Sequence, residues 1–123
     1  GTGRVMAGEL AEMARLAETF GAGEIRLTPE QNGIFVGVSE SRLAAFLAEP
    51  FFARFPYEPH PFERGLVTCV GTDYCNLALI DTKGIGAEVS RCLHEVFGDN
   101  FPPISIRWSG CAAACGSHHN ADL

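Results

Sequence analysis

Four of the five cysteines fall into two close pairs that could bind a metal. Cys69 and Cys75 lie in "TCVGTDYC", and Cys111 and Cys115 lie in "SGCAAACGSHH". Thiolates are ligands for soft metal centres, and four of them suit either a [4Fe–4S] cluster or a structural zinc ion. Neither pair has the two-residue spacing common in zinc sites, so the spacing favours a cluster. Zinc, and a purely structural or disulfide role, remain open alternatives.

The predicted elements place both pairs at strand ends. Cys69 ends a predicted strand at 66–70, and Cys75 falls in the first turn of a helix predicted over 73–80, with Thr72 as its cap. A helix N-terminus lowers a thiol pKa, which favours ligation. Cys111 and Cys115 follow a predicted strand at 104–108 and are separated only by alanines, so the backbone there can approach a bulky group closely.

The fifth cysteine has a different setting. Cys92 shares an apolar stripe with Val89, Leu93, Val96 and Phe97 on a helix predicted over 86–97. Small apolar thiols on such stripes are usually buried and unreactive. We therefore predict that Cys92 is a buried free thiol and not a ligand.

The remaining elements predict an α+β fold. A helix is predicted within "MAGELAEMARLAETFG" (6–21), where apolar residues recur at helical spacing from Leu10 to Phe20, and Gly21 and Gly23 end it. Strands follow at 24–28 and 34–38, and a second helix spans 41–48. Residues 49–65 contain four prolines and several phenylalanines, which favours an ordered loop packed between two lobes.

Composition narrows the choice of function. The chain has 123 residues, 46% hydrophobic, which suffices for one compact domain or two small lobes. A net charge of −6 without a basic cluster argues against nucleic acid as a partner. No apolar run reaches the ~20 residues of a membrane span, and no secretory signal is evident, so a cytoplasmic protein without a membrane partner is expected.

Two stretches carry a family resemblance. "TCVGTDYCNLALIDTKG" and "IRWSGCAAACGSHHNADL" resemble the cysteine signature of the nitrite and sulfite reductases, which hold a [4Fe–4S] cluster beside sirohaem. "GRVMAGELAEMARLAETFGAGEIRLTPEQN" is similar to the second ferredoxin-like half-domain of that family. The resemblance implies a ferredoxin-like half-domain at 1–64, followed at 65–123 by part of a mixed α/β domain that binds the cluster and sirohaem.

The resemblance also implies roles for individual residues. Cys69, Cys75, Cys111 and Cys115 would ligate the cluster, and Cys115 would also bridge to the sirohaem iron. Gln31, Asn32, Arg107 and His118 are candidates for contacts with sirohaem. Plainer roles remain open, because Gln31 and Asn32 could simply form a hairpin turn, and Arg107 and His118 could simply be solvated.

Sirohaem bears many carboxylates, and burying them requires cationic partners. The candidates in this chain are few, namely Arg26, Arg64, Lys83, Arg107, His118 and His119. A complementary half-domain or subunit is therefore expected to supply the others.

Three functions follow from these patterns. The chain could be the cluster-bearing part of a sirohaem-dependent nitrite or sulfite reductase that takes electrons from ferredoxin or a flavoprotein. It could instead resemble precorrin-3B synthase, a related cluster protein. A standalone iron–sulfur subunit for electron transfer or scaffolding, without catalysis, is the third.

Overall fold

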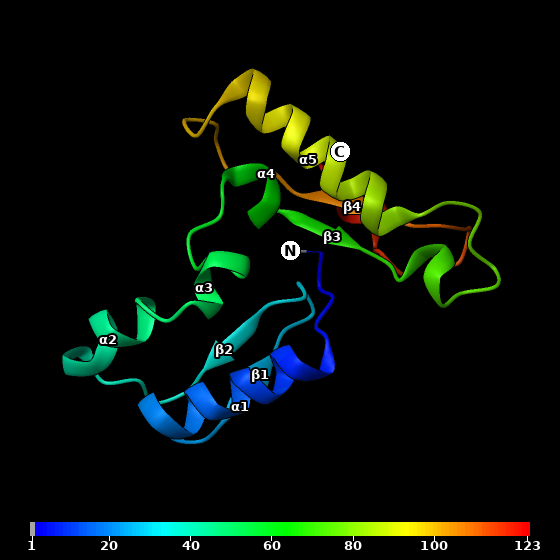
Figure 1. Cartoon of the computed structure of the whole chain (residues 1–123). Coiled ribbons are helices and arrows are strands. Elements are labelled where there is room, and N and C mark those ends of the chain that lie inside the picture. The colour runs from blue at the N-terminus through cyan, green and yellow to red at the C-terminus, as the bar shows by residue number, and fades with distance from the viewer. Residues whose placement is uncertain (1) are drawn as a thin grey trace. The chain divides into compact units, whose positions relative to one another are not determined.

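The computed structural model describes residues 2–123, which divide into two compact units. One unit is Gly3–Tyr57, and the other comprises Thr2 and Glu58–Leu123. The chain therefore divides after Tyr57, whereas the sequence placed the boundary between the family's domains at 64/65; that assignment stays a prediction. The mixture of helices and small sheets confirms the α+β class (Figure 1).

The first unit contains helix α1 (Ala7–Phe20), strands β1 (Ile25–Leu27) and β2 (Gly33–Phe35), and helices α2 (Glu40–Leu47) and α3 (Phe51–Arg54). The two strands are antiparallel, with Ile25 opposite Phe35. Helix α1 ends where predicted, because the Gly21 and Gly23 N–H groups both donate to the Ala17 carbonyl and Gly23 has a φ of +73°.

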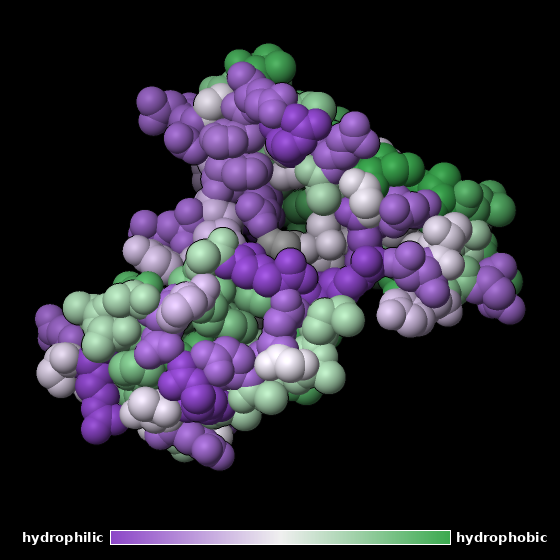
Figure 2. Space-filling view, viewed as in Figure 1, coloured by the Kyte–Doolittle hydropathy of each residue, from purple (hydrophilic) through white to green (hydrophobic). Residues whose placement is uncertain are grey.

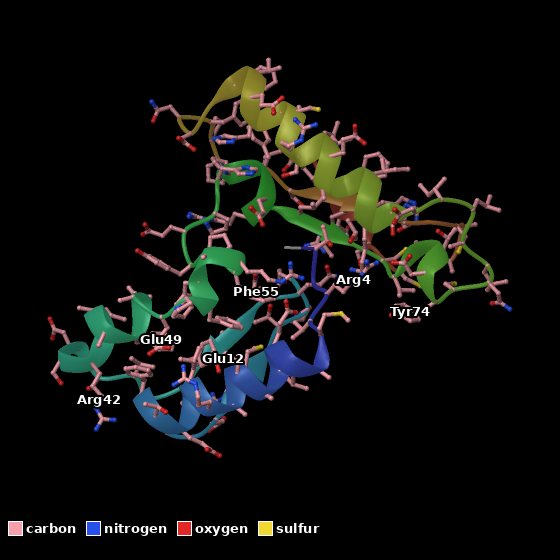
Figure 3. All side chains as sticks on the ribbon, in the orientation of Figure 1. Arg4, Glu12, Arg42, Glu49, Phe55 and Tyr74 are labelled. Carbon is pink, nitrogen blue, oxygen red and sulfur yellow. The ribbon has the colours of Figure 1, made fainter. Side chains whose placement is uncertain are left out.

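Two groups of side chains hold this unit together. Met13, Leu16 and Ala17 of α1 are buried. Rings from three elements pack edge to face with centroids 4.8–6.3 Å apart, among them Phe35, Phe46, Phe51 and Phe52. Arg15 of α1 forms ion pairs with Glu12 at 2.7 Å and with Glu49 at 2.6 Å. Glu12 and Glu49 are labelled in Figure 3.

The second unit contains α4 (Pro61–Arg64), β3 (Leu66–Thr68), the 3-10 turn η1 (Gly71–Asp73), α5 (Thr82–Phe97), β4 (Ile106–Trp108) and the 3-10 turn η2 (His118–Asn120). Strands β3 and β4 are parallel and α5 connects them, with Thr68 opposite Trp108. The core consists of Phe62, Leu66 and Ile106, and Leu93, Phe101, Ile104 and Trp108 pack against it.

Three predicted elements differ from the structure. No helix forms over 74–80, within the predicted helix at 73–80, because the turn η1 already ends at Asp73 and an irregular loop follows. Helix α5 begins at Thr82 instead of 86 because Asp81 caps it by accepting from the Gly84 N–H at 2.9 Å. Residues 49–65 are not a plain loop, since they include the single-turn helices α3 and α4. The phenylalanines of this segment also separate, because Phe51 and Phe52 join the aromatic group of the first unit and Phe62 joins the core of the second.

None of the helices formed by residues 2–123 combines the length and the apolar character that crossing a membrane requires.

Candidate functional site

The parallel pairing of β3 and β4 brings two of the predicted ligands to one edge of a sheet. Cys69 directly follows β3, and Cys111 lies three residues beyond the end of β4. The Cys69 N–H donates to the Trp108 carbonyl at 3.0 Å, which extends the pairing past both strand ends. The carboxyl ends of parallel strands meet at the same edge, so one residue from each pair of cysteines reaches the same place.

Cys69 is held by contacts from two other segments. Its Sγ accepts a hydrogen bond from the Gly110 N–H at 3.2 Å. The Thr82 hydroxyl donates to the Cys69 carbonyl at 2.8 Å, and its oxygen lies 3.6 Å from Sγ. The residue beside Cys111 and the first residue of α5 therefore both fix this cysteine.

These contacts alter the acidity of the Cys69 thiol. Burial raises its pKa, but the contact with the Thr82 side chain, hydrogen bonds from the Gly110 and Gly71 backbone and the Lys83 charge together outweigh burial and lower it. A lowered pKa favours the thiolate, which is the form that binds metal.

Cys75 lies in an irregular loop and not, as predicted, in the first turn of a helix. Its N–H donates to the Gly71 carbonyl at 3.1 Å, and its carbonyl accepts from the Ala78 N–H at 3.3 Å. The Leu79 N–H donates to the Gly110 carbonyl at 2.9 Å. This last bond joins the loop that carries Cys75 to the residue before Cys111.

Tight turns shape the segment of Cys111 and Cys115. The Ala114 N–H donates to the Cys111 carbonyl at 3.3 Å, and Ala114 has a φ of +57°. A Cβ on Gly116 would lie 2.1 Å from the Trp108 carbonyl oxygen, so only glycine fits there. Cys111 is partly buried, and Cys115 is exposed.

The loop that carries Cys75 also carries apolar side chains that are open to solvent. Tyr74 is 82% exposed and is labelled in Figure 3, and Leu77 and Leu79 are 67% and 84% exposed. Figure 2 shows hydrophobic surface over this region, at the right of the view.

All five cysteines are free thiols. Within residues 2–123, no three His, Cys, Asp or Glu side chains are gathered closely enough to hold a metal ion. The structure thus links the cysteine loops through Cys69, Gly110 and Leu79 without bringing the four sulfurs together. Four thiols on linked loops are a donor set that fits a [4Fe–4S] cluster, and the four-thiolate site stays a prediction.

The residues predicted to contact sirohaem occupy turns and a strand. Gln31 and Asn32 form the turn between β1 and β2, where Gln31 has a φ of +62° and its N–H donates to the Thr28 carbonyl at 3.0 Å. Arg107 lies in β4, with its Nε 3.4 Å from the Ser105 hydroxyl. His118 lies in η2, its ring 4.1 Å from that of His119.

Three of the cations proposed for the sirohaem carboxylates have partners within the chain. Arg26 pairs with Glu24 at 2.6 Å, and Arg64 donates to the Pro59 carbonyl at 3.4 Å. Lys83 is buried, with its ammonium 3.3 Å from the Thr68 hydroxyl.

Cys92 is exposed, so the prediction that it is buried is wrong. Its neighbours on the predicted stripe, Val96 and Phe97, are 73% and 53% exposed. Helix α5 instead buries Thr82, Lys83, Gly86 and Ser90. The inward face of α5 includes Gly86, Ser90 and Leu93, whereas Cys92 and Val96 lie outside it.

Sequence reasoning missed the residues that hold Cys69. Thr82 was not singled out, although it follows Asp81, a residue type that commonly caps helices. The contact from Gly110 arises through the backbone, and only a glycine beside a cysteine marks it in the sequence.

Known proteins resemble this chain throughout its length. Residues 2–50 match the family described as the nitrite/sulfite reductase ferredoxin-like half domain. The ferredoxin–nitrite reductase of Synechococcus elongatus is 44% identical over 121 residues, which cover 98% of this chain and 23% of that protein. The assimilatory ferredoxin-dependent nitrite reductase of Haloferax mediterranei is 42% identical over 123 residues, covering 98% and 21%.

A solved structure shows the same fold. The NirA protein of Mycobacterium tuberculosis matches with a TM-score of 0.77 and 24% identity, over 92% of this chain and 21% of that one. The chain spans about a fifth of the length of the curated relatives it matches.

Proposed function

The chain belongs to the nitrite/sulfite reductase family, and from this premise we propose that it is the cluster-bearing portion of a sirohaem-dependent nitrite reductase. The relatives named above are nitrite reductases, which favours nitrite over sulfite. Their names include ferredoxin, which supports ferredoxin over a flavoprotein as the electron donor.

Cys69, Cys75, Cys111 and Cys115 would hold the cluster. A [4Fe–4S] cluster, when bound, accepts and releases single electrons. The single observation that best supports this role is the setting of Cys69, whose sulfur accepts a hydrogen bond from Gly110 and whose backbone is held by Thr82. Hydrogen bonds to ligand sulfur orient a thiolate and tune the bound group.

Sirohaem would require more than this chain. We propose that Cys115, Gln31, Asn32, Arg107 and His118 contribute contacts to it. A complementary half-domain or subunit would supply most of the cations, since Arg26, Arg64 and Lys83 already have partners here. Without that complement, the chain is expected to carry the cluster but not to reduce nitrite.

The test is anaerobic reconstitution of the whole chain with iron and sulfide, followed by metal and acid-labile sulfide analysis. We expect about four iron and four sulfide per chain, as a [4Fe–4S] cluster requires. Cys69→Ser, Cys75→Ser, Cys111→Ser and Cys115→Ser should each lose most of the iron. Cys92→Ser is the matched control and should retain it. Stoichiometric zinc without sulfide, or iron loss only in the control, would contradict the proposal.

A further inference from the structure

Two consecutive polar residues at the start of α5 are buried against the strand that leads to Cys69. Thr82 has no exposed surface, and Lys83 is 8% exposed. Long charged side chains are seldom buried to this extent unless bonds hold them. The hydrogen bonds of Thr82 and Lys83 therefore explain how both side chains are kept buried.

Thr82 fixes the backbone of Cys69. Its hydroxyl has one proton, which it donates to the Cys69 carbonyl at 2.8 Å. The Thr82 oxygen also lies 3.6 Å from the Cys69 sulfur. With the Gly110 N–H at 3.2 Å from the same sulfur, the cysteine is held at its backbone and at its side chain.

Lys83 places a positive charge against Thr68, the residue that precedes this cysteine. Its ammonium lies 3.4 Å from the carbonyl oxygen and 3.3 Å from the hydroxyl of Thr68, the residue before Cys69, and it also donates to the Thr2 carbonyl. Buried charges are screened less by water and salt than surface charges. Lys83 therefore acts on its surroundings more strongly than an exposed arginine on the same helix.

We propose that Thr82 and Lys83 are positioning residues for the cluster ligand Cys69, with Thr82 fixing the cysteine and Lys83 raising the reduction potential of the group it holds. This inference rests on the proposed function, because it assumes a [4Fe–4S] cluster at Cys69. It assigns neither residue a bond to the cluster.

The electrostatics set the direction of the effect. Reduction adds one electron to the cluster and takes one from the donor, and no covalent bond forms or breaks. The reduced cluster carries one more negative charge, so a nearby fixed positive charge stabilises it relative to the oxidised form. Net charge and hydrogen bonds at sulfur are established determinants of cluster potential.

The experiment compares variants of the reconstituted whole chain. Lys83→Met removes the buried charge, Lys83→Arg keeps it, and Arg91→Met removes an exposed charge from the same helix, where Arg91 pairs with Glu95. Midpoint potentials are measured by titration with dithionite and redox dyes, followed by electron paramagnetic resonance. We expect a lower potential for Lys83→Met, and a potential close to that of the unmodified chain for Lys83→Arg and Arg91→Met.

A second pair of variants tests the positioning role through iron content. Thr82→Val removes the hydroxyl and should lower the iron retained after gel filtration, whereas Thr82→Ser keeps the hydroxyl and should retain it. This comparison is decisive for Thr82 even if Lys83→Met fails to fold. If Lys83→Met does not fold, Lys83→Gln is used in its place to remove the charge.

The outcomes separate this inference from the proposed function. Equal midpoint potentials in Lys83→Met and Arg91→Met would overturn the role of the Lys83 charge. Equal iron contents in Thr82→Val and Thr82→Ser would overturn the positioning role of Thr82. Neither result would contradict the presence of a cluster. Failure of the unmodified chain to bind iron and sulfide would overturn the proposed function, and this inference with it.

Discussion

Helix α5 packs so closely on β3 that one added methyl group should destabilise the second unit. Gly86 is buried on α5, and a Cβ there would lie 2.8 Å from the Thr68 Cγ2 atom and 3.5 Å from the Leu66 Cδ1 atom. Real Cβ atoms do not approach another carbon within 3.0 Å, so Thr68 or the helix must move. Thr68 is fully buried and β-branched, which leaves it little freedom to turn away.

Two opposing effects decide the sign for Gly86→Ala. Alanine favours a helix over glycine by about 1 kcal/mol. Overpacking a tight core costs roughly 1–3 kcal/mol. Because the clash is with a stiff, fully buried side chain, we expect overpacking to prevail, with a net loss of about 1 kcal/mol. Movement of Thr68 should also displace Cys69 and lower iron retention.

Gly8→Ala is the matched control, because Gly8 lies in α1 with no atom within 4 Å of the added Cβ. It should stabilise the first unit by up to about 1 kcal/mol. Urea unfolding is followed by far-UV circular dichroism for both variants. Fluorescence of Trp108, the only tryptophan, reports the second unit separately. An unchanged or raised free energy of unfolding for Gly86→Ala would refute the close packing inferred between α5 and β3.

Three further predictions concern pH, the fifth cysteine and catalysis. Burial and the parallel His94 ring, 4.2 Å away, lower the pKa of His60, while Glu63 and Asp99 oppose them. The unfolded chain therefore binds this proton more readily, and the free energy of unfolding should fall as pH drops below about 6.5. His60→Asn, which can still cap α4, should show a smaller fall, and an identical pH profile would argue against this origin. Cys92→Ala should change the free energy of unfolding by less than about 0.5 kcal/mol, since the thiol is exposed; a larger loss in urea unfolding would indicate that Cys92 is packed. The chain loaded with iron and sulfide should show no enzymatic nitrite reduction with a low-potential dye, and robust turnover would mean that the cations of this chain suffice.

The amino-acid sequence alone determined the features that depend on local pattern and residue type. The stretches around Cys69, Cys75, Cys111 and Cys115 carried the family resemblance, and the glycines after Phe20 fixed the end of α1. The strands that precede Cys69 and Cys111 were also predictable as strands, because short β-branched and aromatic runs favour that conformation. Each of these signals lies within a few residues of the feature it predicts.

The tertiary structure decided which faces and loops meet. The helical spacing of apolar residues in α5 was visible in the sequence. Which face of the helix packs on β3 depends on Gly86 fitting against Thr68, and this orientation leaves Cys92 exposed. Residues 73–80 read as a helix, yet the Leu79 N–H bonds to Gly110, more than thirty residues away, and the loop stays irregular. The contacts of Thr82 and Gly110 with Cys69 likewise join distant segments. Helical period and capping are local properties, whereas packing and hydrogen bonds between segments arise only when the chain folds.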